Sequence, residues 1–285
     1  MRVLVTGSDG QLGTELVALL KGRASHEVLG LDLPEHDLTD RDHVLGVLTA
    51  WRPDVVVHAA AMTAVDRCET EVELAHRVNC LATRFVADGA RRVGAHVLYV
   101  STDYVFDGTK DSPYVEWDTP NPQSVYGRTK LGGEREIDPG WTIARTSWVC
   151  GEHGPNMVHT LLRLADGDGE VHFVDDQRGH PTLTADLAPM LATLALGRVP
   201  GTFHTTNQGA VSWYEFAREV FTLAGADPDR VRPVTTAGLT PPRPAPRPAN
   251  SVLDDVAWRG HGFAPSRDFR EPLAELVARL RAEPR

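Results

Sequence analysis

The sequence predicts an α/β fold with a doubly wound parallel sheet and a smaller C-terminal lobe. Three observations lead to this prediction. Short apolar runs alternate with stretches of helical periodicity through the first half of the chain, as expected for strands joined by crossover helices. The runs are continuously apolar, which is typical of strands that helices bury on both faces. The third observation is a glycine-rich turn after the first run.

The predicted elements follow one another in regular order. We expect strands at 2–5, 27–32, 54–60, 96–103 and 141–146, with helices at 11–21, 40–51 and 71–92 between the first four. After Lys130 the pattern loosens, and further helices are expected at 156–165, 184–196, 212–224 and 269–281. We therefore assign residues 1–150 to a dinucleotide-binding domain of the Rossmann type. Residues 151–285 form mainly a substrate-binding lobe, with some segments returning to the sheet.

The segment 240–251, with the sequence TPPRPAPRPANS, is dense in proline. It should be extended rather than helical, because proline and the residue before it disfavour a helix. The segment is either a linker or, through Arg243, Arg247 and Asn250, a site for an anionic partner.

The composition of the chain argues against several classes of function. The chain has 285 residues, 41% hydrophobic and 24% charged, which is ordinary for a globular protein. No apolar run approaches the ~18 residues that span a bilayer, and the opening MRVLVTG does not have the pattern of a signal peptide. We expect a cytoplasmic protein without membrane contact. A net charge of −10 argues against a nucleic-acid partner. The cysteines, Cys68, Cys80 and Cys150, predict neither a disulfide framework nor a metal site.

Gly7, Gly10 and Gly13 occupy the turn between the first strand and the first helix. Glycines there let the backbone approach a diphosphate, which the N–H groups and dipole of the helix N-terminus then stabilise. The first gap is one residue longer than in the GxGxxG pattern. Asp32 closes the second strand, nineteen residues after Gly13, where an acidic residue binds the adenosine ribose. A carboxylate there favours NADH over NADPH, although Asp32 is also a candidate helix cap.

A second group of residues predicts chemistry. Thr102 ends the strand 96–103, and ligands of such sheets bind beyond the carboxyl ends of the strands. Tyr126 and Lys130 follow at a spacing that places both on one face of a helix. A free phenol with a pKa near ~10 is a poor acid at neutral pH, but a nearby ammonium would lower that pKa. Tyr126 could then protonate a carbonyl oxygen while hydride reaches the carbon, with Thr102 orienting the same carbonyl.

The order of motifs resembles the dTDP-4-dehydrorhamnose reductase family, a group of extended short-chain dehydrogenases/reductases. The stretches that carry the resemblance are TGSDGQLG (6–13), HAAAMTAVDRCETE (58–71), STDYVFDG (101–108), VYGRTKLGGE (125–134), RTSWV (145–149), DQRGHPT (176–182) and RPANSVL (247–253). It implies an NADH- or NADPH-dependent oxidoreductase that reduces the C4 ketone of a dTDP-linked 6-deoxyhexose, as in dTDP-L-rhamnose biosynthesis. It also allows a homodimer, and a Mg²⁺ ion at a subunit contact with Glu15 as a ligand, although no cluster of ligands in the sequence supports the ion.

The resemblance also implies roles for single residues. Thr102, Tyr126 and Lys130 would be catalytic. Asn79 matches a position that orients the lysine in the wider superfamily, although a core Asn fits equally well. Cofactor contacts would come from Gly7, Gly10, Gln11, Leu12, Gly13, Asp32, Asp37, Leu38, Ala59, Ala60, Ala61, Thr63, Tyr126 and Lys130. Substrate contacts would come from Thr102, Asp103, Tyr104, Phe106, Trp148, Arg178, His180 and Arg247.

The chain departs from the family pattern at several positions. His58 stands where relatives often carry Asn, and we expect a buried wall residue rather than a catalyst. Arg178 and His180 stand where a bulky apolar residue and a small residue are more usual, so this departure falls at the sugar end of the pocket. A sugar-nucleotide dehydratase would need an acidic residue where this chain has Tyr104. The same motifs would also suit a deoxysugar 4-ketoreductase of secondary metabolism, or a non-catalytic regulatory subunit that binds NAD(P).

Overall fold

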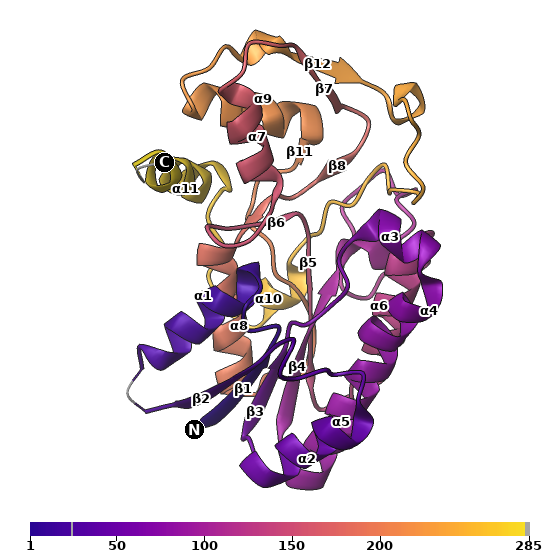
Figure 1. The fold of residues 1–285 in the computed structure, drawn as a ribbon, viewed down its shortest axis with the longest axis vertical. Coiled ribbons are helices and arrows are strands. Elements are labelled where there is room, and N and C mark those ends of the chain that lie inside the picture. Colours follow the sequence, from indigo (N-terminus) through magenta and orange to yellow (C-terminus); the bar gives the residue numbers. More distant parts are fainter. Residues whose placement is uncertain (24, 283–285) are drawn as a thin grey trace.

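The computed structural model describes residues 1–23 and 25–282, and within them it contains a six-stranded parallel sheet (Figure 1). The predicted Rossmann-type α/β fold is confirmed. The strand order is β2–β1–β3–β4–β5–β10. The bounds are β1 (Arg2–Thr6), β2 (Glu27–Leu31), β3 (Val55–His58), β4 (His96–Thr102), β5 (Thr142–Thr146) and β10 (Gly201–His204).

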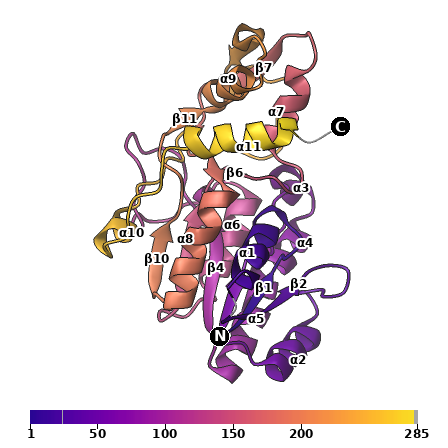
Figure 2. The same cartoon turned by 90° about the vertical axis from the view of Figure 1, so that its left-hand side faces the viewer.

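Helices cover both faces of this sheet, which explains the continuous apolar runs (Figure 2). Val3 and Val5 of β1 point to one face, where they pack with α1 (Gln11–Lys21) and α8 (Thr184–Gly197). Leu4 points to the other face, toward α2 (Arg41–Trp51) and α5 (Ala82–Val93). Because successive side chains of a strand point to opposite faces, every position of such a strand must be apolar.

The smaller lobe has an apolar core of its own at the other end of the molecule (Figure 1). Phe216 and Phe269 are fully buried between its helices. The helices are α7 (Met157–Ala165), α9 (Trp213–Leu223) and α11 (Arg270–Ala282). Short strand pairs complete the lobe: β7 (Val171–Val174) with β12 (Val231–Val234), β8 (Arg178–Gly179) with β11 (Val211–Ser212), and β6 (Val149–Cys150) with β9 (Thr182–Leu183). Two segments from the second half of the chain belong to the sheet domain: α8 packs on one face of the sheet, and β10 is its edge strand next to β5.

The expected helix 71–92 is three consecutive pieces. They are α4 (Val72–His76), a π-helical turn (Arg77–Leu81) and α5. Asn79 lies in the π turn, and its carbonyl oxygen accepts hydrogen bonds from Thr83 Oγ1 at 2.9 Å and from Tyr99 Oη at 3.4 Å. π turns of this kind often occur at functional sites.

The remaining helices are short or frame the site. They are α3 (Val65–Thr70), α6 (Val125–Glu134) and α10 (Val256–Gly260). The Tyr126–Lys130 spacing predicted α6, whereas α3 and α10 were not expected, and neither was the strand β10. No helix among the described residues has the length and apolar character needed to cross a bilayer.

The proline-rich strap, residues 240–251, contains no helix, as expected. It is more than a linker, because Arg247 donates to both carboxylate oxygens of Asp66 in α3, at 2.9 and 2.7 Å. The side-chain amide of Asn250 donates to the carbonyl oxygens of Lys110 and Ser112. The strap therefore ties the chain that follows β12 of the lobe to the sheet domain, and the anionic partner of Arg247 is an internal carboxylate.

Candidate active site

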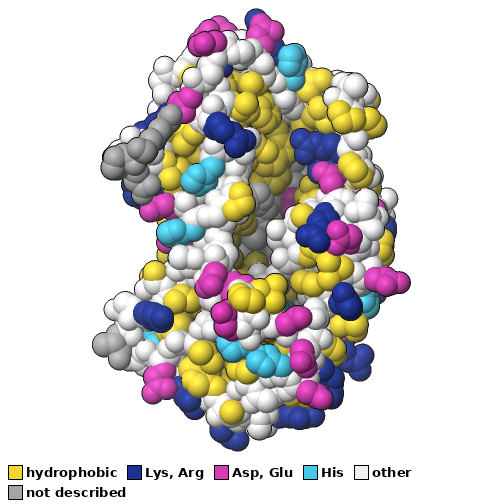
Figure 3. Space-filling model, viewed as in Figure 1, with side chains coloured by type: hydrophobic (Ala, Val, Ile, Leu, Met, Phe, Trp, Pro, Cys, Tyr) yellow, Lys and Arg dark blue, Asp and Glu magenta, His cyan; other side chains and the backbone are white. Residues whose placement is uncertain are grey.

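A cavity of about 560 Å³ lies at the carboxyl ends of the strands. It opens at the point where the strand order reverses: the chain runs from β1 to β2 on one side and then crosses back to β3 on the other side of β1, the position at which such sheets bind ligands. Figure 3 shows the surface hollowed between the two parts of the molecule. Every residue expected to contact a dinucleotide lines this cavity: Gly7, Gly10, Gln11, Leu12, Gly13, Asp32, Asp37, Leu38, Ala59, Ala60, Ala61, Thr63, Tyr126 and Lys130.

The glycine loop leaves no room for side chains. Gly7 has a φ of 68°, in the left-handed region, and a Cβ there would press on the backbone of Ala60. A Cβ on Gly13 would overlap the carbonyl oxygen of Gly7. Gly10 precedes α1, and no side chain caps this helix. Its first N–H groups are therefore available to donate hydrogen bonds to a ligand. The loop therefore fits the diphosphate of a dinucleotide.

The substitution Gly13→Ala should abolish this fit. The added methyl group must displace the Gly7 carbonyl, so we expect NADH affinity to fall at least ~100-fold, because the diphosphate loses the N–H groups of the loop. Isothermal titration with NADH measures the change. Gly46→Ala in α2 is the matched control, since a Cβ there meets nothing within 4 Å. Equal affinity for NADH in both variants would contradict this role of the loop.

Asp32 organises the loop directly. Its Oδ2 accepts a hydrogen bond from the Asp9 backbone N–H at 2.8 Å, and its Oδ1 accepts one from Leu33 at 2.8 Å. The carboxylate thus joins the end of β2 to the glycine loop and still lines the cavity. A negative charge at this point opposes a phosphate group more than a hydroxyl.

The loop after β3 is held from below by buried polar residues. His58 Nδ1 lies 2.7 Å from Thr6 Oγ1, which in turn accepts the Ala60 N–H at 3.2 Å. Burial lowers the pKa of His58 to about 3, with the Lys130 charge adding to the effect, so His58 is neutral. The Asn79 side chain accepts the Met62 N–H at 2.8 Å and donates to the Met62 carbonyl at 3.2 Å. Asn79 therefore fixes this loop, and no hydrogen bond joins it to the Lys130 ammonium in the described structure.

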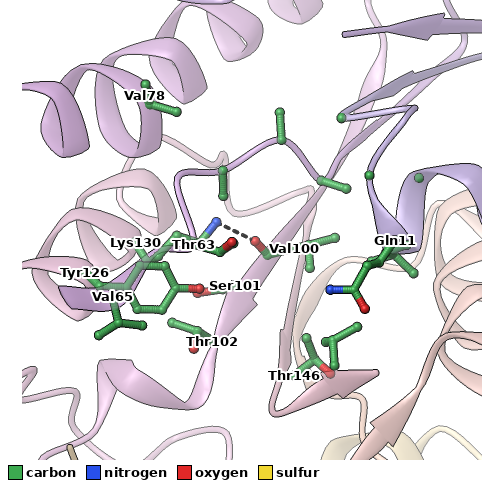
Figure 4. A pocket seen from close by; sticks show the side chains of 18 of the residues that line it. Gln11, Thr63, Val65, Val78, Val100, Ser101, Thr102, Tyr126, Lys130 and Thr146 are labelled. Carbon is green, nitrogen blue, oxygen red and sulfur yellow. Dashed lines mark hydrogen bonds between the residues drawn. The ribbon is translucent and has the colours of Figure 1, made fainter. Parts of the chain in front are cut away.

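Thr102, Tyr126 and Lys130 meet in the same cavity (Figure 4). Tyr126 and Lys130 lie one turn apart on α6, and both face the end of β4, where Thr102 stands. Ser124 caps this helix by accepting the Gly127 N–H at 3.1 Å, which fixes the first turn beneath the phenol. Thr102 Oγ1 donates to the Asp103 carboxylate at 2.9 Å.

The electrostatics differ from the expectation in one respect. Burial raises the pKa of Tyr126, and the Thr102 hydroxyl beside it offsets only part of the rise. The Lys130 ammonium instead donates to the Val100 carbonyl at 2.7 Å and lies 4.1 Å from the centre of the Tyr99 ring. Burial lowers the pKa of Lys130 to about 7. The expected lowering of the Tyr126 pKa by Lys130 is therefore wrong, because burial of the phenol dominates and the Lys130 ammonium binds the Val100 carbonyl instead.

Aromatic side chains line the end of the cavity beyond the phenol. The indole rings of Trp148 and Trp213 stack at 3.7 Å, with 9° between their planes. Trp148 has a φ of 45°, which is uncommon for a large residue and is typical of sites where neighbours fix the backbone. Tyr104 meets the Tyr126 ring edge-on at 5.5 Å. This wall suits the apolar face of a sugar ring.

The other residues expected on the substrate side fall into two groups. Asp103 lines the main cavity, whereas Phe106 and Arg247 line a neighbouring cavity of about 180 Å³ that shares Tyr104 with it. Arg178 and His180 line neither. Arg178 pairs with Glu215 at 3.2 Å. His180 is buried against Thr206, 3.1 Å away, and burial lowers its pKa to about 4.

Some cavity residues were not anticipated. Trp213 is the first residue of α9, and Ser212 and Glu215 form a capping box around that position. The Ser-x-x-Glu spacing predicts the helix start, but not the direction of the indole. Further residues of this kind in the lining are Leu31, Leu33, Val65, Val78, Val100, Ser101, Thr146, Ser147 and Val149.

The described part of the chain contains no cluster of side chains that could bind a metal ion. No group of three or more His, Cys, Asp or Glu side chains is arranged to hold an ion there. Glu15, the candidate ligand, accepts a hydrogen bond from Thr184 Oγ1 at 3.5 Å.

Comparison with known proteins identifies the family. Residues 1–282 match the family described as the RmlD substrate binding domain. The chain is 45% identical to a dTDP-4-dehydrorhamnose reductase of Streptomyces griseus, over 98% of this chain and 94% of the relative. It is 44% identical to a probable dTDP-4,6-dihydroxy-2-methyloxan-3-one 4-ketoreductase of Streptomyces antibioticus, over 96% and 94%.

The fold matches as well. A crystal structure of dTDP-4-dehydrorhamnose reductase from Bacillus anthracis in complex with NADP superimposes with a TM-score of 0.92 at 35% identity, covering 98% of this chain and 99% of that one. The chain therefore belongs to the dTDP-4-dehydrorhamnose reductase family, whose members are NAD(P)-dependent oxidoreductases of the short-chain dehydrogenase/reductase type.

Proposed function

We propose that this enzyme reduces the C4 ketone of a dTDP-linked 6-deoxyhexulose, converting dTDP-4-dehydro-L-rhamnose to dTDP-L-rhamnose. One observation carries the proposal. A single cavity joins a glycine loop that fits a dinucleotide to Thr102, Tyr126 and Lys130, and then to the Trp148–Trp213 wall. The sugar nucleotide and the nicotinamide cofactor are both metabolites of the cytoplasm, which supports a cytoplasmic location for the enzyme.

The chain's own residues divide the work of reduction. A bound nicotinamide cofactor supplies hydride to the carbonyl carbon. Tyr126 gives its hydroxyl proton to the carbonyl oxygen, so that a C4 alcohol forms, and regains a proton from solvent. Thr102 turns its hydroxyl proton from the Asp103 carboxylate to that oxygen and orients it with a second hydrogen bond. Lys130 holds a positive charge beside the phenolate that Tyr126 leaves, and the positive charge of the oxidised ring acts in the same direction.

For the cofactor we propose NADH in preference to NADPH. The carboxylate of Asp32 in the cavity lining supports this preference, because it would repel a 2′-phosphate. The relative from Bacillus anthracis was crystallised with NADP, so the family does not exclude the phosphorylated form. The ratio of kcat/KM for the two cofactors measures the preference directly. A ratio that favours NADPH would refute the proposed role of Asp32.

A related 4-ketoreductase of secondary metabolism is the second candidate. The near-equal identity to a probable ketoreductase of Streptomyces antibioticus favours keeping it. A dehydratase is disfavoured, because Tyr104 would have to replace an acidic catalyst. Burial raises the pKa of Tyr104, so it is a phenol that does not ionise near neutral pH.

One assay tests these functions together. The absorbance of NADH and of NADPH is followed with dTDP-4-keto-6-deoxyhexoses of both C5 configurations, and the products are identified. The proposal expects stoichiometric oxidation with the L-configured substrate. Preference for the other epimer would indicate the second candidate, and cofactor turnover without net oxidation would indicate a dehydratase or epimerase. No reaction, together with a stable protein partner, would indicate a regulatory subunit.

A further inference from the structure

A carboxylate lies buried one helical turn beyond Lys130. Glu134 is the last residue of α6, and only 7% of it is exposed. Residues four apart on a helix share a face, so Glu134 stands on the same side as Lys130. Glu134 does not line the cavity. Any part it has in the reaction must therefore act through another residue.

Two partners fix this carboxylate. Arg145 of β5 donates to both of its oxygens, from Nε to Oε1 at 2.8 Å and from Nη2 to Oε2 at 2.7 Å. The hydroxyl of Ser101, next to Thr102 at the end of β4, donates to Oε1 at 2.6 Å. Ser101 and Arg145 are also buried, at 3% and 4% exposure. The Ser101–Glu134–Arg145 network thus joins α6, β4 and β5 behind the cavity.

Stability alone does not account for this network. Replacing a buried ion pair by apolar residues of similar volume is often neutral or stabilising by about 1–4 kcal/mol. The location of the network offers a reason for its presence. Lys130 has three N–H donors, and the described structure gives them one hydrogen-bond acceptor, the Val100 carbonyl. No carboxylate among the described residues forms an ion pair with this ammonium, so its charge depends on groups slightly further away.

The groups around Lys130 come from four elements. Burial makes three of them neutral, because it lowers the pKa of the histidine and raises the pKa of both phenols. Glu134 supplies the negative charge and opposes the effect of burial on the pKa of Lys130. Among the described residues these groups are His58 of β3, Tyr99 of β4, Tyr126 and Glu134 of α6, and Arg145 of β5, whose positive charge is paired with Glu134.

We propose that Glu134 is a positioning residue for the reaction: Ser101 and Arg145 hold its carboxylate where it keeps Lys130 in the ammonium form. The proposal rests on the proposed function for the role of the lysine in turnover, but the charge state of Lys130 can be measured without any substrate. A neutral amine would lose the attraction for the phenolate that Tyr126 leaves.

The chain is well suited to a direct measurement. It contains three lysines, Lys21, Lys110 and Lys130. Labelling with ε-¹³C lysine therefore gives three side-chain signals, which Lys21→Arg and Lys110→Arg assign. In the unaltered protein the Lys130 signal should titrate near pH 7. In Glu134→Gln we expect its midpoint to fall by about one pH unit or more.

A second variant guards against misfolding. Glu134→Gln leaves Arg145 buried without a counter-charge, which is strongly destabilising, whereas Glu134→Gln/Arg145→Met removes both charges. Both variants should show a lower Lys130 midpoint, by less in the double variant, because loss of the Arg145 cation raises the pKa of Lys130 and offsets part of the change. In each variant the alkaline limb of kcat/KM should move to lower pH by the same amount as its Lys130 midpoint. Glu136→Gln, two residues further on, is the matched control and should change neither.

The outcomes separate the two proposals. A Lys130 midpoint unchanged in the folded double variant, or a loss of kcat that is uniform across pH, would overturn the role of Glu134. A lower midpoint supports that role even when no dTDP-ketosugar is reduced by the unaltered enzyme. In that case the proposed function fails and the assignment of Glu134 to the charge of Lys130 stands.

Discussion

Tyr126→Phe is expected to lower kcat for ketosugar reduction by about 10²–10⁴-fold, the usual contribution of a positioned general acid. The Tyr126 hydroxyl lines the cavity beside Thr102. Its raised pKa keeps it protonated, so that it can donate the proton to the substrate oxygen during reduction. The ring would remain in its apolar contacts with Val125 and Tyr104. NADH binding and the thermal midpoint should therefore change little.

Stopped-flow and steady-state NADH oxidation measure this effect, and titration of NADH fluorescence measures binding. Tyr214→Phe in α9 removes the same hydroxyl at a position outside the cavity lining and serves as control. Turnover of the Tyr126→Phe variant within tenfold of the parent would refute a role as proton donor. Loss of NADH binding would instead indicate that the phenol holds the cofactor.

Lys130→Met is expected to have opposite effects on activity and stability. Turnover should fall at least ~100-fold, because no cation remains beside the phenolate. Stability should rise, since the pKa of Lys130 falls from 10.5 in the unfolded chain to about 7 in the folded one. The unfolded state then binds more protons between these values, and the folded state bears a penalty that is complete below pH 7 and disappears toward pH 10.5.

The size of that penalty decides the sign of the stability change. The difference in pKa corresponds to at most about 5 kcal/mol, against about 1–3 kcal/mol for leaving the Val100 carbonyl without its donor. Chemical denaturation at pH 6 should therefore show Lys130→Met to be more stable by at most about 2–4 kcal/mol, and the gain should shrink as the pH rises above 7 and be gone before pH 10.5. Lys21→Met, on the exposed end of α1, is the control. A destabilised variant at pH 6 would show that the ammonium is not desolvated as described.

Much of the sheet could be predicted, because a strand that is buried on both faces needs apolar residues at successive positions. Val3, Leu4 and Val5 are such a run, shared between the two core layers. Strand β10 escaped prediction because Phe203 is its only buried apolar residue, and backbone pairing with β5 holds the rest. The π turn could not be predicted, because the helical apolar pattern continues through Arg77–Leu81. A turn with one extra residue does not change that pattern visibly.

The candidate site divides in the same way. Spacing alone placed Tyr126 and Lys130 on one face, and both line the cavity. Spacing could not reveal that the ammonium binds the Val100 carbonyl, because this depends on the packing of α6 against β4. Trp213 and the ion pair of Arg247 with Asp66 were equally hidden, since each depends on segments far apart in the chain.

The Trp148–Trp213 stack joins the turn after β5 to the first residue of a helix in the lobe. The residues to which we assign the reduction, Thr102, Tyr126 and Lys130, stand on other segments, at β4 and α6. On this assignment, mutations in the lobe should reshape the compartment proposed for the sugar without moving these three residues. Such independence lets one ancestral scaffold diversify into enzymes for different deoxysugars, and Trp213 is a natural first position to randomise when a new product is sought.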